Sequence, residues 1–301
     1  MKKRVITGAV YAIVCVALLV LKWTFYLLPA QYAEYGALGF DLMFELVAII
    51  GCIEFLRAIG GVSFPQKALT LAFCAAIIPV YVIVEMIMGQ GFFAAACFFC
   101  IYVLIHAAFA VFDHSRSTAR GAFTCVGAML YCGILPAVLA GINHIGDNSV
   151  AAIIVLFVVT MLTDSVAFFV GSIFKNIFPK KLAPHLSPGK TIVGAVGGLL
   201  GGIIGAIVSY YLYVGIGGYI GTTLVYESGM PAVVAFIIVG LIVSVAVQIG
   251  DLFESAIKRE CNIKDMGTLL PGHGGVLDRF DGLLFGGVFT FILFAVVINV
   301  I

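Results

Sequence analysis

The chain alternates between long apolar runs and short polar segments along nearly its whole length. Nine of the apolar runs approach or reach the roughly 17–25 residues that a membrane-spanning helix needs. We predict these spans at about 5–21, 38–56, 68–88, 92–111, 122–141, 149–170, 191–214, 232–250 and 283–301. Because lipid offers no hydrogen-bond partner to an open backbone, each span is most simply an α-helix. The pattern therefore predicts an all-α, polytopic integral membrane protein.

Composition agrees with a membrane protein and excludes a soluble one. The 301 residues are 63% apolar and 10% charged, whereas soluble domains carry about 25% charged residues. A net charge of +1 gives no indication of a nucleic-acid partner. We expect 1–301 to form a single polytopic membrane domain, with 1–145 as a helical scaffold and 146–301 as a catalytic part that contains the loops 172–190 and 251–282.

The basic residues predict the orientation of the chain in the membrane. If the amino terminus is cytoplasmic, the connections on that side hold all 16 Lys and Arg residues except Lys22. Positive residues gather on the cytoplasmic side, so both loops, 172–190 and 251–282, are predicted to face the cytoplasm. The short basic start MKKR, with no transit segment after it, favours a bacterial inner membrane.

The polar segment 251–282 mixes charges of both signs. Its charged residues are Asp251, Glu254, Lys258, Arg259, Glu260, Lys264, Asp265, Asp278, Arg279 and Asp281. In a helix, Asp251 and Glu254 share one face. Clustered carboxylates repel each other unless a cation lies between them, and their hard oxygens suit Mg²⁺. Interleaved basic residues indicate that the ligand is a metal–phosphate complex; a solvated loop with incidental ion pairs is the simpler alternative.

Two further stretches are candidates for phosphate binding. In "PGHGG", Gly274 and Gly275 allow the backbone to approach a ligand closely, and His273 could bind phosphate, transfer a proton or brace the turn. In "SPGKT", which includes Lys190, the start of the following helix favours phosphate. An ordinary positive-inside anchor explains the lysines of that loop equally well.

Several polar residues lie within the predicted spans. Asp164 is a functional candidate because a charge inside the membrane is costly, although a structural hydrogen bond would also explain it. The overlapping G-x-x-x-G rows of 194–205 predict close helix packing. Glu85 and His106 could serve transport, but paired structural roles are at least as plausible.

The stretch "SAIKRECNIKDMGTLLPGHGGVLDRFDG", residues 255–282, resembles the signature of the phosphatidate cytidylyltransferase family. The matching positions are Ser255, Lys258, Arg259, Lys264, Asp265, His273, Gly274, Gly275, Asp278, Arg279 and Asp281. "TDSVAFFVG" and "KLAPHLSPGKT" resemble two further motifs, so the likeness covers about 160–282. Gly189 and Val193 depart from the usual pattern, which has lysine and glutamate there.

The resemblance implies transfer of the cytidylyl group of CTP to phosphatidate, giving CDP-diacylglycerol and pyrophosphate. The chemistry of the side chains then assigns Mg²⁺, with a second cation left open, to Asp251, Asp278 and Asp281, and phosphate neutralisation to Lys258, Arg259, Lys264 and Arg279. The remaining candidates for ligand binding are Asp164, Ser187, Lys190, Thr191, Ser255, His273, Gly274 and Gly275.

The expected partners are CTP, phosphatidate and membrane lipids, without nucleic acid, and the long packing faces are compatible with a homodimer. Two rival functions remain. A CTP-dependent lipid-alcohol kinase would transfer the γ-phosphoryl group instead. An ion-coupled transporter would place its charges near the middle of the membrane and often has repeated halves.

Overall fold

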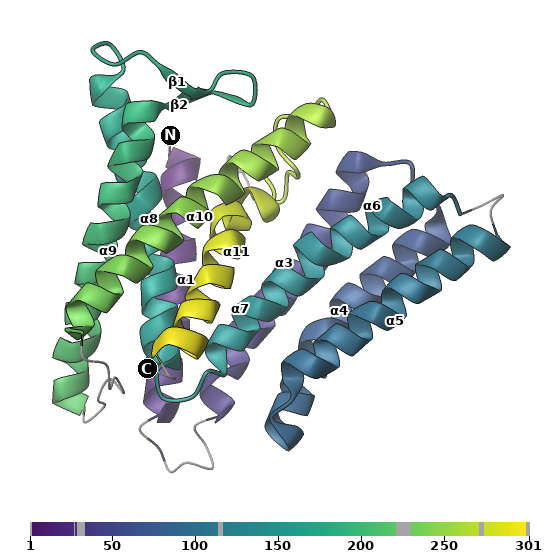
Figure 1. Ribbon diagram of the computed structural model, residues 1–301, viewed down its shortest axis with the longest axis horizontal. Coiled ribbons are helices and arrows are strands. Elements are labelled where there is room, and N and C mark those ends of the chain that lie inside the picture. Colours follow the sequence, from purple (N-terminus) through teal and green to yellow (C-terminus); the bar gives the residue numbers. More distant parts are fainter. Residues whose placement is uncertain are drawn as a thin grey trace. The chain divides into compact units, whose positions relative to one another are not determined.

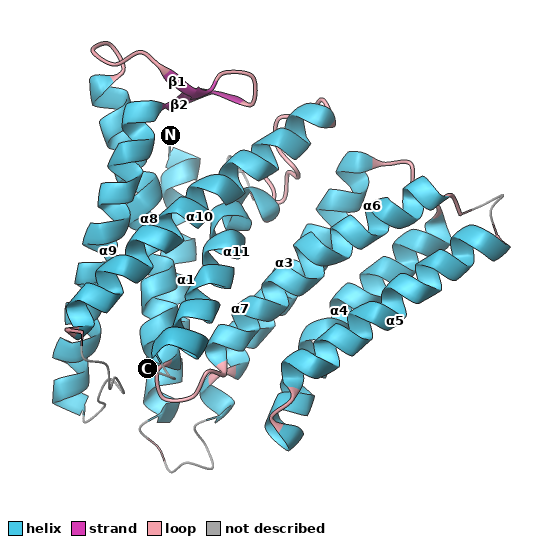
Figure 2. Cartoon of the chain, viewed as in Figure 1, coloured by secondary structure: helices cyan, strands magenta, loops and turns pink. Residues whose placement is uncertain are grey.

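The computed structural model describes residues 2–26, 28, 34–113, 117–220, 230–270 and 274–298. Over these residues the chain is almost entirely helical, as Figure 2 shows. The α-helices are α1 (Lys2–Tyr26), α3 (Leu38–Ile59), α4 (Phe64–Met88), α5 (Gly91–Phe112), α6 (Ala119–Met129), α7 (Leu135–Asn143), α8 (Ser149–Phe174), α9 (Ile192–Ile220), α10 (Ala232–Glu260) and α11 (Leu277–Ile292). Short helical turns are η1 (Glu34–Gly36), η2 (Leu130–Ile134) and η3 (Leu293–Ile298), and the two strands are β1 (Lys181–Ala183) and β2 (Ser187–Thr191).

Helix occurs at each of the nine predicted span positions. Within the described ranges, six helical segments are long and apolar enough to cross a membrane. These are Phe64–Met88, Gly91–Phe112, Ala119–Asn143, Ser149–Phe174, Ile192–Gly215 and Ala232–Glu260. The protein is therefore a polytopic membrane protein, as the hydropathy pattern predicts.

Two compact units are present, and each combines segments that are distant in the sequence. Unit 1 contains 1–18, 38–141 and 261–279, whereas unit 2 contains 19–37, 142–260 and 280–301. In unit 1, α4 packs against α3, α5 and α6, and α4 and α5 run side by side in Figure 1. The predicted division at residue 145 remains a prediction.

Local sequence signals explain where α4 lies. Ser63 precedes its first residue and forms a capping box with Gln66, and Gly89 ends the helix with a left-handed φ of 65°. His106 of α5 lies 3.3 Å from the Thr70 hydroxyl in the buried interior of unit 1. This contact favours the structural interpretation of His106.

In unit 2, α9 packs against both α8 and α10 through its glycines (Figure 1). A Cβ on Gly202 would lie 2.8 Å from the Gly240 carbonyl oxygen of α10, and one on Gly197 would lie 2.6 Å from the Val170 Cβ of α8. The Ser244 hydroxyl donates to the Gly198 carbonyl across the same contact, at 3.0 Å. The predicted close packing of the glycine rows is confirmed.

The polar segments are more ordered than the hydropathy pattern predicts. Helix α10 continues to Glu260 and α11 begins at Leu277, so the segment expected as a loop at 251–282 is helical at both ends. The helix outlasts the apolar run because Glu, Lys and Arg are good helix formers. In the segment 172–190, β1 pairs with β2 in an antiparallel hairpin that the all-α prediction missed.

Candidate functional site

One face of α10 carries the predicted polar group within unit 2. Glu254 is fully buried, and its Oε2 accepts a hydrogen bond of 2.6 Å from the Lys258 ammonium group one turn later. The other carboxylate oxygen, Oε1, is buried without a hydrogen-bond partner. Asp251, one turn earlier, forms an ion pair with Lys190 of β2. The face that the spacing predicts is therefore present and already partly neutralised.

Asp281 of α11 adds a third carboxylate to this face. A Cβ on Gly250 of α10 would lie 2.6 Å from the Asp281 carbonyl oxygen, so the two backbones are in close contact. Asp281 lies outside the six candidate spans. Burial raises its pKa to about 6, and the negative charge of Asp251 acts in the same direction. We call Asp251, Glu254 and Asp281 the acidic group.

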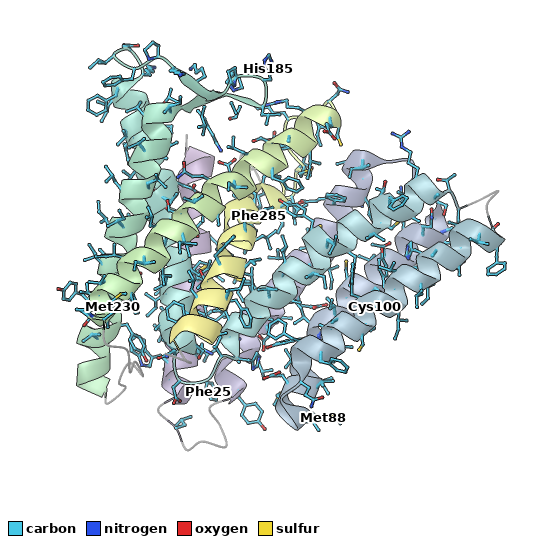
Figure 3. All side chains as sticks on the ribbon, viewed as in Figure 1. Phe25, Met88, Cys100, His185, Met230 and Phe285 are labelled. Atoms are coloured by element: carbon cyan, nitrogen blue, oxygen red, sulfur yellow. The ribbon has the colours of Figure 1, made fainter. Side chains whose placement is uncertain are left out.

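The hairpin lies against the carboxyl-terminal part of α10. Besides the ion pair of Lys190, the Arg259 Nε donates a hydrogen bond of 3.1 Å to the Leu186 carbonyl. Figure 3 labels His185 on the connection between the two strands, next to Leu186. The hairpin is thus attached at both its turn and its second strand, and it brings a cation to the acidic group.

The end of the hairpin leads directly into α9. Thr191 is buried, and its hydroxyl accepts a hydrogen bond of 3.1 Å from the Gly194 backbone N–H, so it caps this helix. A Cβ on Gly189 would meet no atom within 4 Å. The lysine that the family pattern has at this position would therefore have room, and its absence here is not imposed by packing.

Asp278, three residues before Asp281, belongs to unit 1. It is buried, and its Oδ2 accepts hydrogen bonds of 2.8 Å from the Met266 backbone N–H and 2.7 Å from that of Gly275. Gly274 has a φ of 86°, a conformation that favours glycine. In this structure Asp278 holds the backbone at Met266 and Gly275, and its predicted role as a metal ligand remains a prediction.

Glu54 of α3 is a residue of this region that the sequence interpretation missed. Its two carboxylate oxygens each accept one hydrogen bond of 3.0 Å, from the backbone N–H groups of Val276 and Leu277. Glu54 lies in an apolar run like other acidic residues of the spans, and its partners are more than 200 residues further along the chain. Spacing in the sequence carries no signal for such a contact.

The other predicted residues lie in several places. Ser255 is buried on α10 and Ser187 is half-buried on β2, whereas Asp164 is exposed on α8; all three belong to unit 2. Lys264 and Arg279 are exposed in unit 1. Asp265 is exposed in the same loop, and His273 lies outside the described residues.

The acidic group has the donor chemistry of a hard-cation site. Carboxylate oxygens are the ligands that Mg²⁺ prefers, and Glu254 contributes a buried oxygen without a hydrogen bond. In the part of the chain that the structure describes, however, no three His, Cys, Asp or Glu side chains are arranged to hold a metal ion. One carboxylate of the group is occupied by Lys190. The side chains fit Mg²⁺ by chemistry, and metal binding remains a proposal.

Comparison with known proteins extends over nearly the whole chain. Residues 2–297 match the profile of a family described as the cytidylyltransferase family. A phosphatidate cytidylyltransferase of Bacillus subtilis is 29% identical over 98% of this chain and 98% of its own length. One of Brucella abortus is 39% identical over 46% of this chain and 47% of its own, and one of Staphylococcus saprophyticus is 33% identical over 59% and 60%.

Proposed function

Because this chain belongs to the cytidylyltransferase family, we propose that it transfers the cytidylyl group of CTP to phosphatidate and releases pyrophosphate. The product is CDP-diacylglycerol, a precursor for phospholipid biosynthesis. The observation that carries the proposal is the acidic group of unit 2 with basic residues bound to it: Lys258 pairs with Glu254, and Lys190 pairs with Asp251. Sites that handle phosphates and metals combine these two kinds of charge.

The reaction requires two anions to meet. An oxygen of the lipid phosphate attacks the α-phosphorus of CTP, a new P–O bond forms, and the bond to the pyrophosphate oxygen breaks. Since the nucleophile is already anionic, no strong general base is needed. The barrier lies in charge repulsion and alignment, and both are lowered by fixed cations that hold the phosphates in line.

The polar side chains in and next to the acidic group have distinct roles in this reaction. Lys190, Lys258 and Arg259 bind phosphate oxygens of the two substrates, which requires Lys190 to exchange its ion pair with Asp251 for a phosphate. Asp251 and Asp281 would hold Mg²⁺, whose positive charge would neutralise the triphosphate and polarise the phosphorus. Thr191 keeps the hairpin fixed to the start of α9. Ser187 and Ser255 contribute hydroxyl groups near the same face.

The location in the membrane follows from the basic residues. We propose nine spans with the amino terminus in the cytoplasm, in the cytoplasmic (inner) membrane of a bacterium. CTP is soluble in the cytoplasm, whereas phosphatidate keeps its acyl chains in the leaflet and its phosphate at the surface. A charged site at the cytoplasmic ends of the helices is reached by both substrates. Whether the protein forms the predicted homodimer is a separate proposal.

A label-transfer experiment tests the function. The full chain is purified in detergent and given phosphatidate, Mg²⁺ and CTP labelled at either the α- or the γ-phosphorus. We expect label in the lipid from the α-position alone. Label from the γ-position alone would make the protein a lipid kinase. Absence of transfer from both, while the Bacillus subtilis relative is active under the same conditions, would overturn the proposal and favour a transporter.

A further inference from the structure

We infer that Glu54 is a positioning residue for the reaction proposed above, because it fixes the loop 261–276 and the start of α11 to α3. The side chain is 5% exposed, and both of its oxygens are used, one by the Val276 N–H and one by the Leu277 N–H, each at 3.0 Å. Glu54 does not belong to the family signature found in the sequence, and no motif indicates it. Both hydrogen bonds lie within unit 1.

The two hydrogen bonds of Glu54 are made to backbone N–H groups at the start of α11. The first backbone N–H groups of a helix have no partner inside the helix, and a carboxylate placed there also interacts favourably with the helix dipole. Usually a side chain next to the helix start supplies this cap. Here the cap comes from another helix, 222 residues earlier in the chain. The start of α11 is therefore fixed in position relative to α3.

The backbone around Glu54 is shaped to admit the carboxylate. A Cβ on Gly275 would lie 2.5 Å from both carboxylate oxygens, and a Cβ on Gly267 would collide with the same group. Any larger residue at either glycine would push Glu54 away from its two amide partners. The lack of a side chain at these two positions is thus explained by the space that Glu54 occupies, without any contact to a substrate.

Glu54 acts together with Asp278. Asp278 binds the N–H groups of Met266 and Gly275, while Glu54 binds the two that follow. The two buried carboxylates thereby hold the backbone at Met266 and at residues 275–277. Gly274 of the signature lies between these held positions, and Lys264 and Asp265 come directly before Met266, so the positions of all three depend on the two carboxylates.

The test compares two substitutions of similar chemistry in unit 1. Glu54→Gln keeps the size of the side chain but places an NH₂ group against a backbone N–H, so one hydrogen bond is lost. Glu85→Gln is the control, because Glu85 accepts a hydrogen bond of 2.8 Å from the Gly91 N–H at the start of α5, away from the loop. Glu54→Asp keeps both oxygens on a shorter arm.

Two readouts are measured on the purified full chain. The first is kcat and KM for CTP, and the second is the rate of trypsin cleavage after the exposed Lys264, which follows opening of the loop. For Glu54→Gln we expect a kcat at least about tenfold lower and cleavage at least about tenfold faster, since bonds to charged groups are the stronger ones. Glu54→Asp should recover part of both, and Glu85→Gln should stay within about twofold of the wild type on both.

The results separate positioning from simple stabilisation. Unchanged cleavage and kcat in Glu54→Gln would overturn the inference. Equal losses in Glu54→Gln and Glu85→Gln, with equal falls in melting temperature, would also overturn it. If the wild type transfers no label from CTP, the proposed function fails, but the cleavage rates still test whether Glu54 fixes the loop.

A double substitution provides a second test. Gly267→Ala should lower kcat about tenfold or more in the wild type, because the new methyl group displaces Glu54. In a Glu54→Ala background that methyl group has space, so the same change should cost less than about twofold further. Additive losses in the two backgrounds would show that Gly267 acts independently of Glu54 and would contradict the inference.

Discussion

Asp278 and Asp281 lie three residues apart on one helix and have opposite surroundings. Asp278 faces donors, the N–H groups of Met266 and Gly275. Asp281 lies among the other carboxylates of the acidic group, and its Oδ1 accepts a hydrogen bond of 2.7 Å from the Gly282 N–H. A carboxylate among carboxylates destabilises the folded protein unless a cation joins them. Asp281 is therefore the stronger candidate for contact with the metal.

Replacing Asp281 by Asn removes one negative charge from the acidic group and leaves the shape of the side chain nearly unchanged. We expect Asp281→Asn to lower the rate of cytidylyl transfer about 100-fold or more, because even groups that only support a metal ligand typically contribute about 10–100-fold. The protein should still insert and purify as the wild type does. Glu260→Gln, an exposed residue at the end of α10, is the matched control, and a near-normal rate for Asp281→Asn would remove it from the metal site.

The stability of the metal-free protein should depend on pH through Asp281. Its folded pKa of about 6 lies above the ordinary value of 3.8, so its contribution to stability is greatest below about pH 4 and falls as the pH rises through 6. Without Mg²⁺, Asp281→Asn should therefore melt at a higher temperature than the wild type at about pH 7.5, with the difference shrinking towards about pH 4. Added Mg²⁺ should raise the melting temperature of the wild type more; equal shifts in both proteins would argue against a metal at Asp281.

Single positions differ in how much of their role the sequence reveals. Spacing alone places Asp251, Glu254 and Lys258 on one face of a helix, and the structure confirms that face. It cannot distinguish Asp278 from Asp281, since their partners come from other segments. The same limit hides Glu54, whose charge looks like that of any acidic residue in an apolar run until α11 is placed beside it.

At the scale of elements, the extension of α10 and the hairpin define the polar part of unit 2. The apolar pattern predicts which part of α10 lies in the membrane. It does not predict that the helix continues to Glu260, because hydropathy indicates which residues contact lipid and not where a helix ends. The hairpin is too short to show an alternating pattern, and its position depends on contacts of Lys190 and Leu186 with α10. Glycine rows, by contrast, predict helix packing well because a missing side chain acts directly at the contact.

The packing of α9 against α10 allows a direct test. Gly202→Ala would place a methyl group against Ser244 and the Gly240 carbonyl, and overpacking of this kind costs about 1–3 kcal/mol of stability. Gly215→Ala, on the same helix, meets no atom within 4 Å and should leave stability unchanged or slightly higher. Thermal unfolding in detergent measures both, and equal melting temperatures for the two variants would contradict the packing described for Gly202.

At the scale of the whole molecule, neither compact unit is continuous in the sequence. Unit 1 takes its last segment, 261–279, from the far end of the chain, and unit 2 takes 19–37 from near the beginning. Hydropathy predicts the helices of both units correctly, because each span needs an apolar surface and must form its backbone hydrogen bonds within itself. It carries no information on which helices associate, since lipid-facing and partner-facing apolar surfaces have the same composition.

The orientation in the membrane can be measured with cysteine labels. In a variant without its eight native cysteines, Lys264→Cys should be protected from a membrane-impermeant thiol reagent in intact cells and labelled after the cells are opened. Asp147→Cys, in the connection predicted to lie outside, should be labelled in intact cells. The reverse pattern would invert the predicted topology, and labelling of both positions in intact cells would contradict the assigned spans.

The bond between Glu54 and α11 also affects how the protein is made. Ribosomes synthesise α3 long before Val276 and Leu277 exist, because 222 residues separate Glu54 from the first of these partners. During that interval the carboxylate of Glu54 has neither amide. A chain whose synthesis stops before residue 276 lacks both hydrogen bonds of Glu54, and its folded state is less stable for that reason. Completion of α11 therefore changes the surroundings of a residue in α3, which was synthesised more than 200 residues earlier.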